Sequence, residues 1–491
     1  MSSTTRVGLL AGATALTLTS VSIGAPATGN DDMAQRLAAA EAKIAAMEAA
    51  QNQNWLTEQR ADEIKGLVQD VLADADTRAS LLQSGATSGY DNGFILSSTD
   101  GNWLLRLNFL MQQRFIWNHI DNDDIGFIDE SEDADRYGFE NTRSTLRLSG
   151  HVVNPSWFYR LDVNFGNAET LTNSFPYGDD DDETGFVPWE SYWGRMGTLR
   201  AYLGYDYGNG WRMKMGTMKA PFMREELVEP EYQLAVERSV LNYAFSPGYV
   251  DGLGFEWNGD QFRVEGMFSD GAQTGHTVWI NGPFFDFNVP GNHGFENYKG
   301  HHAEYALTGR AEFLVNGTWD QFRDFTSPKG GETGILLGAA AHWQSSESGV
   351  NGDNSVDTLL VTGDVSVEFG GANLYGAVVW SDVDIDFPGG GNFSNNPWGF
   401  IVQGGFYLDE TWEPYLRFEW GDYDIDDVDE AIILTGGVNK YFAGHNAKWT
   451  TDVGYGFNPV FSPATVTGWR NDLGDEHDGQ WVVRTQVQIL F

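Results

Sequence analysis

Basic side chains recur at alternate positions in several segments of this 491-residue sequence, a spacing that could guide anions. Alternate residues of an extended strand share one face, so each series would place its guanidinium or ammonium groups along one wall. In a water-filled lumen such a row attracts anions. The same row could instead pair with acids on neighbouring strands and only hold the wall together. The candidates for an anion track are Arg106, Arg114, Arg143, Arg147, Arg160, Arg200, Arg212 and Lys214.

Acidic residues cluster in segments that we expect to be long loops, where carboxylates could bind a hard cation. Four of them, together with Gly126, match positions of a calcium-binding loop, but Ile125 stands where an oxygen ligand belongs. A solvated, mutually repulsive outer surface explains the same residues without a metal. We expect no cofactor, and Ca²⁺ or Mg²⁺ on these loops is the alternative. The candidate ligands are Asp121, Asp123, Asp129 and Glu132.

Composition excludes several classes of protein. The chain has 29 Lys and Arg against 70 Asp and Glu, a net charge of −41, so it would repel nucleic acid. An apolar fraction of 41% and a mean hydropathy of −0.36 exclude an α-helical membrane bundle. With no cysteine, there is neither a disulfide scaffold nor a thiolate metal site. The nine histidines fall mostly in predicted loops, and no HExxH motif or P-loop occurs, so we predict no catalytic residues.

The elements that position the basic residues are strands with one apolar and one polar face. Leu105, Leu107 and Phe109 alternate with Arg106 and Asn108, and this period of two recurs to the end of the chain. Long and short connections alternate between the segments, as an up-and-down barrel with one external rim requires. The sequence therefore predicts an all-β fold, an antiparallel transmembrane β-barrel of about 16 strands. The strands are predicted to begin near 103, 140, 156, 198, 210, 250, 261, 303, 334, 357, 372, 398, 411, 430, 446 and 480.

The segments before the barrel differ in pattern. Residues 1–27 combine a positive start, an uncharged run and Ala25-Pro26-Ala27, which indicates an export signal. Residues 28–83 are helical and coiled-coil-like, with an a/d seam at Met33, Leu37, Ala40, Ile44 and Met47. This helix either packs on the chain's own body or joins subunits as a stalk. Residues 84–92 are expected to be a linker and residues 93–491 the barrel, with both ends of the barrel and the helical segment in the periplasm.

Two further segments carry a family resemblance. Residues 211–227 read WRMKMGTMKAPFMREEL, a strand followed by the pattern G-x-x-K-x-P-F-x-x-E, and Glu237-Arg238-Ser239 come soon after. Residues 436–455 read GGVNKYFAGHNAKWTTDVGY. Both resemble the phosphate-selective porin O/P family of outer-membrane porins. The resemblance implies a sixteen-stranded homotrimer whose third external loop, residues 219–249, folds inward. It also implies that Lys219, Arg224 and Arg238 lie near the constriction.

These observations together predict an outer-membrane porin, a passive diffusion channel for small hydrophilic solutes and ions. A preference for anions or phosphate stays open, because only six lysines follow residue 90 and phosphate-specific relatives use lysine clusters. The expected partners are outer-membrane lipid, two further copies of the chain, small solutes or anions, and the barrel-assembly machinery, which would read the terminal strand ending in Phe491. An outer-membrane enzyme, or a structural or adhesive barrel with a stalk directed to the cell wall, is the alternative.

Overall fold

The chain divides into two units, Met1–Leu81 and Leu82–Phe491. The computed structural model describes residues 30–54, 65–66, 86–120, 135–166, 197–272, 303–348, 354–387, 391–424, 429–458, 460, 467–470 and 479–491. In the first unit, helix α1 (Asn30–Asn54) follows the predicted seam, and its side chains from Gln35 to Met47 are exposed. The predicted signal and most of the second helical run lie outside the described residues. No helix in the described part of the chain is long and apolar enough to cross a membrane.

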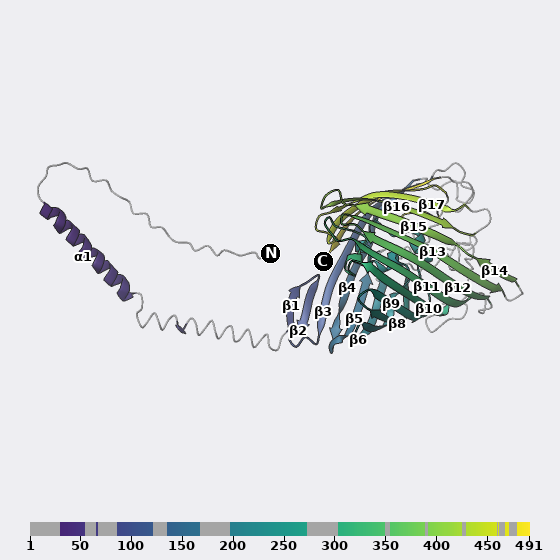
Figure 1. Ribbon diagram of the computed structural model, residues 1–491, viewed down its shortest axis with the longest axis horizontal. Helices are drawn as coiled ribbons and strands as arrows, with labels where there is room; N and C mark the ends of the chain where they lie inside the picture. The colour runs from purple at the N-terminus through teal and green to yellow at the C-terminus, as the bar shows by residue number, and fades with distance from the viewer. Residues whose placement is uncertain are drawn as a thin grey trace, which may run out of the picture. The chain divides into compact units, whose positions relative to one another are not determined.

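The second unit is a closed antiparallel barrel (Figure 1). Its last strand, β19, pairs with its first, β3, so the wall has no open edge. Among the nineteen strands of the described residues, sixteen form this wall. They are β3 (Leu104–Ile120), β4 (Asp135–Val152), β5 (Asn154–Asn164), β6 (Gly197–Gly208), β7 (Trp211–Lys219), β8 (Tyr249–Asn258), β9 (Phe262–Ser269), β10 (Ala303–Asn316), β11 (Gly334–Ser348), β12 (Asn354–Glu368), β13 (Ala372–Phe387), β15 (Trp398–Phe406), β16 (Trp412–Asp422), β17 (Ala431–Tyr441), β18 (Ala447–Gly456) and β19 (Gln480–Leu490).

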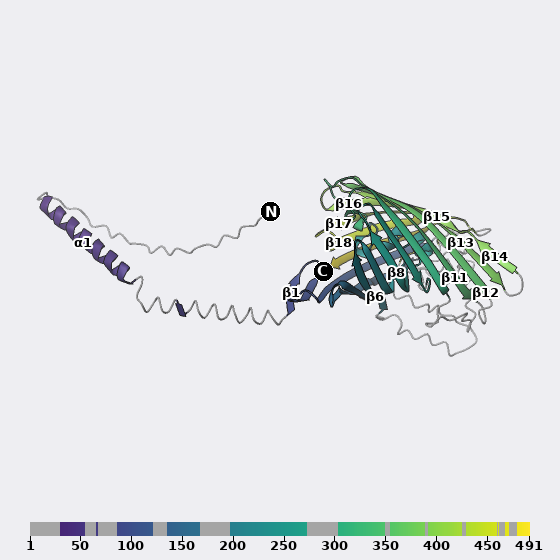
Figure 2. The ribbon, with the colours of Figure 1, turned by 60° about the horizontal axis from the view of Figure 1, so that its bottom comes forward.

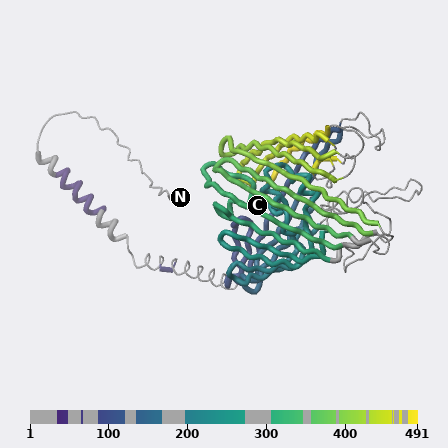
Figure 3. The backbone as a smooth tube through the Cα atoms, turned by 45° about the vertical axis from the view of Figure 1, so that its right-hand side comes forward, coloured from purple at the N-terminus to yellow at the C-terminus, as the bar shows by residue number. Residues whose placement is uncertain are grey.

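The predicted fold class and strand order are confirmed, and each wall strand begins within about five residues of its predicted start. The strands run obliquely around the barrel (Figures 2 and 3). Short connections gather on one rim, which we call the short-turn rim, at residues 209–210, 259–261, 369–371, 407–411 and 442–446. The connection at 317–333 is the longer exception that the sequence indicated. In the tightest turn, Gly208, Asn209 and Gly210 all have positive φ, a conformation that glycine adopts without strain.

Three short strands were not predicted. Strands β1 (Ala86–Tyr90) and β2 (Phe94–Ser98) form a hairpin, and β2 pairs with the start of β3. The expected linker 84–92 is therefore partly a strand, because Tyr90 and Phe94 pair across a turn that carries Gly93 at positive φ. Strand β14 (Gly391–Asn395) pairs with the end of β13. The turn predicted at Asn154-Pro155 lies one residue earlier, at Val153.

The two faces of the wall differ as the alternation predicts. Outward residues such as Leu307, Val378 and Leu416 are 51%, 47% and 55% exposed, as a face that contacts lipid would be. Aromatic residues gather near the strand ends, where the rings of Trp398 and Trp420 lie 4.6 Å apart. Inward residues are mostly buried, and the segment that buries them connects β7 to β8.

Candidate functional site

Residues 219–249, which we call the inner loop, fold into the lumen and are almost entirely buried. The loop contains α3 (Arg224–Leu227), the 3₁₀ turn η2 (Pro230–Tyr232) and α4 (Val240–Phe245). The hydroxyl of Ser239 caps α4 by accepting a hydrogen bond from the Asn242 amide. The inward fold that the sequence resemblance implied is therefore present.

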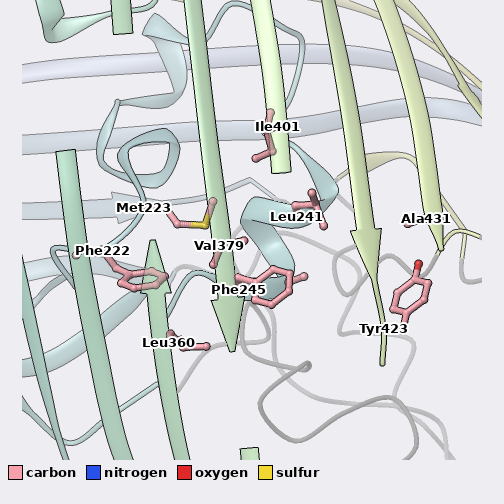
Figure 4. Packing of buried hydrophobic residues seen from close by; sticks show 11 residues of the cluster. Phe222, Met223, Leu241, Phe245, Leu360, Val379, Ile401, Tyr423 and Ala431 are labelled. Carbon is pink, nitrogen blue, oxygen red and sulfur yellow. The ribbon is translucent and has the colours of Figure 1, made fainter. Parts of the chain in front are cut away.

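One side of the inner loop is held by apolar packing. Phe222, Met223, Leu241 and Phe245 point toward side chains of β11 to β13 and β15 (Figure 4). All four are at most 2% exposed. Burying four large apolar side chains contributes several kcal/mol, so this half of the loop is fixed to the wall. The strand residues of the cluster are Ala340, Leu360, Val379, Ile401 and Ala431.

The other side of the loop is held by buried ion pairs, centred on Glu237. Both Nη atoms of Arg143 donate to its carboxylate at 2.9 Å, and Nη1 of Arg114 lies at 3.5 Å. The Tyr243 hydroxyl donates to the same carboxylate at 3.0 Å. Burial opposes ionisation of Glu237, but the charges of Arg143 and Arg114 outweigh it and hold its pKa well below the usual range. Glu237 therefore anchors the loop to β3 and β4 as a carboxylate.

Two further glutamates of the loop repeat this arrangement. Glu229 accepts hydrogen bonds from both Nη atoms of Arg200, at 2.8 and 3.2 Å, and from Arg160 at 3.4 Å. Glu231 accepts from both Nη atoms of Arg147, one of them at 2.9 Å. Burial opposes their ionisation, but the neighbouring arginines lower the pKa of both carboxyls. The loop thus brings its own negative charges to the basic wall.

On the far side of the lumen, side chains of the wall strands form hydrogen bonds mainly with the backbone of the loop. Arg417 donates to the Glu237 carbonyl oxygen at 2.7 Å, and Arg310 to the Phe222 carbonyl oxygen at 2.8 Å. The Val240 amide donates to Glu419 at 2.8 Å. Bonds to strands on opposite sides of the barrel fix the loop in position.

A polar cavity of about 840 Å³, which we call the vestibule, lies between the inner loop and the short-turn rim. Its wall includes turn residues 443–446 and the end of β19. Six arginines and four glutamates line it, so its charge is positive in a chain that is −41 overall. These are Arg106, Arg147, Arg160, Arg224, Arg263 and Arg323, with Glu229, Glu231, Glu265 and Glu312.

Two vestibule arginines differ from the rest because they form no ion pair with a described residue. Arg263 lies 4.0 Å over the ring of Trp319, and its Nε is buried without a hydrogen-bond partner in the described part of the chain. Arg224 donates to the Ser366 hydroxyl at 2.9 Å and to the Phe322 carbonyl oxygen at 2.6 Å. Aromatic stacking orients both guanidinium groups without neutralising them.

His445 joins three elements at the wall of the vestibule. Its Nδ1 lies 3.0 Å from the Glu231 carbonyl oxygen and its Nε2 3.4 Å from the Asp324 carboxylate. His445 therefore links the inner loop, the turn 442–446 and the connection 317–333.

The sequence of this region resembles a known family. Residues 112–321 match the family model of phosphate-selective porin O and P. The matched porin segment includes the inner loop and the glutamates that anchor it. No curated protein has a matching sequence.

Solved structures of outer-membrane channels are similar to the barrel. The barrel is similar to the anion-selective porin from Comamonas acidovorans at 14% identity and a TM-score of 0.51, over 79% of this chain and 99% of that one. The outer membrane channel DcaP of Acinetobacter baumannii aligns at 13% identity and a TM-score of 0.49, over 81% and 99% of the two chains. At these identities the likeness concerns the fold. Family and fold together indicate an outer-membrane channel.

The eight candidates for the anion track all lie on the lumen side, and each contacts a carboxylate. Arg114, Arg143, Arg147, Arg160 and Arg200 meet the inner loop or its neighbouring acids, as described above. Arg106 pairs with Asp91 at 3.2 Å, Arg212 with Asp206 at 2.9 Å, and Lys214 with Glu256 and Glu265 at 2.9 and 2.6 Å. The wall-holding interpretation therefore describes their contacts in this structure.

The three constriction candidates lie in different surroundings. Lys219 donates to the Glu226 carbonyl oxygen and is buried. Arg238 is 1% exposed and donates to the carbonyl oxygens of Glu225 and Val228, both at 3.2 Å. These two serve the fold of the loop, whereas Arg224 lines the vestibule.

Sequence reasoning missed the acids of the inner loop and the aromatic partners of the vestibule arginines. Glu229 and Glu231 lie in a segment with no periodicity, so no rule placed them opposite arginines. The excess of acidic residues within a loop that was predicted to enter a basic lumen could have indicated that they pair with arginines of the wall. The proposed cation ligands, Asp121, Asp123, Asp129 and Glu132, lie outside the described residues. Within the described ranges, no three His, Asp or Glu side chains converge as metal ligands would.

Proposed function

We propose that this porin passes small hydrophilic solutes by diffusion and prefers anions, without catalysing a reaction. The observation that carries the preference is the pair Arg224 and Arg263, which line the vestibule without an ion-pair partner among the described residues. A positive charge that is not cancelled by a neighbour raises the local concentration of anions. Arginines that are already paired with glutamates contribute less to this field.

The preference is for anions in general rather than for phosphate alone. Arg224 and Arg263 each present a planar guanidinium, which binds carboxylate and phosphate oxygens equally well. Four carboxylates share the same vestibule and weaken its field for a multiply charged ion. The anion-selective porin from Comamonas acidovorans has a similar fold, and its selectivity is consistent with this proposal.

The test is the reversal potential of the purified porin in a planar bilayer under a KCl gradient. We expect a potential of the sign that chloride permeation gives, and a shift toward zero in the double variant Arg224→Gln/Arg263→Gln. The matched control is Arg212→Gln, which removes an exposed arginine already paired with Asp206. A reversal potential of the wild type near zero would contradict the proposed anion preference. An absence of conductance would contradict the proposal that the protein is a channel. Phosphate that blocks chloride current at low concentration would favour phosphate specificity instead.

Export, assembly and oligomeric state complete the proposal. We infer that residues 1–27 direct export, that the terminal strand ending in Phe491 is read by the barrel-assembly machinery, and that three copies associate. Helix α1 supports association, because Leu37, Ile44 and Met47 are 63%, 53% and 58% exposed along one seam. Deleting residues 33–82 should weaken the trimer on unheated gels. An unchanged trimer would show that the helix does not join subunits.

A further inference from the structure

Beside the vestibule, the inner wall of β6 to β9 carries five linked charges near the short-turn rim, which we call the charge ladder. Asp206 pairs with Arg212 at 2.9 Å, and Arg212 lies 3.7 Å from Glu256. Lys214 pairs with Glu256 at 2.9 Å and with Glu265 at 2.6 Å. Glu265 also lines the vestibule, so the charge ladder borders the space that a solute would cross.

The two glutamates of the ladder stand directly opposite each other on neighbouring strands. Glu256 of β8 and Glu265 of β9 are partners in register, which places their Cβ atoms about 5 Å apart on one face of the wall. Like charges at such a pair repel each other and destabilise the sheet. Among the described residues, Lys214 is the one cation within ion-pair distance of both carboxylates. The ladder therefore depends on this lysine to neutralise the pair.

The position of Lys214 on β7 lets its ammonium reach both strands of the pair. Its partner in register on β8 is Gly254, which has no side chain to stand between Lys214 and β9. The ammonium extends across β8 to Glu265 and also contacts Glu256, two residues along β8 from Gly254. An ammonium carries three rotatable donors, so it can serve two carboxylates from one position.

Partial burial gives these charges influence beyond their own contacts. The side chains of Lys214, Glu256 and Glu265 are 16%, 18% and 24% exposed, whereas that of Arg212 is 48% exposed. Partly buried charges are screened by salt less than exposed ones. The charge of Glu256 acts on Arg263, one of the two vestibule arginines that carry the proposed anion preference. Glutamates without a counter-charge at this place would therefore oppose the positive field of the vestibule.

We propose that Lys214 is a specificity-determining residue, which keeps the vestibule from selecting cations by masking Glu256 and Glu265. With Lys214 in place, the three acids of the ladder face two bases, and without it they face only Arg212. Lys214 acts through the two glutamates, because its ammonium is occupied by them. The inference rests on the proposed anion preference and names the residue that protects it.

The first test is the reversal potential of the full chain in a planar bilayer under a KCl gradient. We expect Lys214→Met to move the potential to the potassium side of zero, and Lys214→Arg, which keeps the charge, to stay near the wild type. Arg212→Gln removes the same charge from a more exposed pair and should shift the potential less. No shift in Lys214→Met, or an equal shift in Arg212→Gln, would overturn the proposal.

The same measurement separates this inference from the proposed function. A wild-type potential near zero would contradict the anion preference alone, because the shift in Lys214→Met is measured from the wild type and would still support masking. If Lys214→Met does not fold, Glu265→Gln provides the opposite change, since it leaves Lys214 with one acid fewer. Glu265→Gln should shift the potential toward chloride, and an unchanged potential would overturn the proposal.

The second test distinguishes masking from direct contact between Lys214 and permeating anions. In Lys214→Met, the two freed carboxylates can take up a divalent cation through their oxygens. Added CaCl₂ should therefore return the potential of Lys214→Met toward the wild-type value while leaving the wild type unchanged. The double variant Lys214→Met/Glu265→Gln, which lacks one carboxylate of the pair, should lose this response. A Lys214→Met channel that ignores Ca²⁺, or a wild type that responds equally, would overturn the proposal.

Discussion

The arginines beneath the inner loop and the two at the vestibule have the same charge but different surroundings. Arg143 and Arg114 are 1% exposed and share the carboxylate of Glu237. Arg224 and Arg263 rest on aromatic rings and form no salt bridge with a described residue, although the charges of Glu312 and Glu256 act on Arg263 and Arg224 acts on Glu368. The first pair fixes the shape of the lumen, and the second leaves its charge available to a solute. The number of basic residues on a barrel wall therefore does not show which of them determine ion selectivity. The ion-pair partners of each basic residue must be known as well.

The largest expected effect comes from removing the carboxylate that Arg143 and Arg114 share. Glu237→Ala leaves Arg143 and Arg114 buried without their common partner, which should destabilise the seated loop by about 3–5 kcal/mol. We expect noisier single-channel current and faster proteolysis within residues 219–249. Glu332→Ala, at an exposed position of the connection 317–333, is the matched control. Wild-type current noise in Glu237→Ala would mean that the apolar side of the loop is sufficient to hold it.

Acid should loosen the same group more gradually. Burial raises the pKa of Glu229, Glu231 and Glu237, but the arginine charges outweigh it and lower all three. A carboxyl group whose pKa is lowered by folding stabilises the folded protein fully at pH values above its unfolded pKa of about 4.3. This stabilisation is lost as the pH falls through the lowered pKa of the folded state. Single-channel current should therefore keep its noise level from pH 7 to pH 5 and become unstable only below about pH 4. A transition near pH 6 would implicate another group.

The smallest effect concerns the second group. Glu312 lines the vestibule and lies 3.0 Å from Arg310. Arg310 keeps its two hydrogen bonds to Asp364, at 2.8 and 3.0 Å, so Glu312→Gln should leave the fold intact. It should add to the net positive charge of the vestibule and shift the reversal potential a few millivolts further toward chloride. An unchanged reversal potential would mean that this carboxylate does not face the permeating ion, and a shift toward potassium would contradict the prediction.

The barrel was predictable from the sequence and the site was not, for one physical reason. Strands such as β3 and β19 must present one face to lipid and one to water. Apolar and polar residues therefore alternate along their sequences, and this pattern can be recognised locally. The inner loop is buried on every side, and its order comes from contacts with strands distant in the chain. Glu237 meets Arg143 across 94 residues, and Arg417 meets the Glu237 carbonyl across 180. No local pattern encodes such pairs.

The short additions to the wall were missed for a related reason. Strands β1, β2 and β14 have five residues each, too few to show a period. The segment 84–92 is rich in Gly, Ser and Asn, which is typical of a linker, yet pairing with β2 orders it. The stacking of Arg263 on Trp319 joins a strand to a turn, and no local sequence pattern indicates that the two residues meet.

The position of the inner loop couples the loop to the closure of the barrel wall. The loop follows β7, but its side chains and backbone are bonded to β3 and β4 on one flank and to β16, β17 and β18 on the other. The last seam of the wall, between β19 and β3, passes directly over this packed segment: Gln112 of β3 and Gln488 of β19 both donate to its backbone. Gln112 also donates to the Gln488 side chain across the seam at 2.8 Å, so the closing contact of the wall and the seat of the loop share the same two side chains.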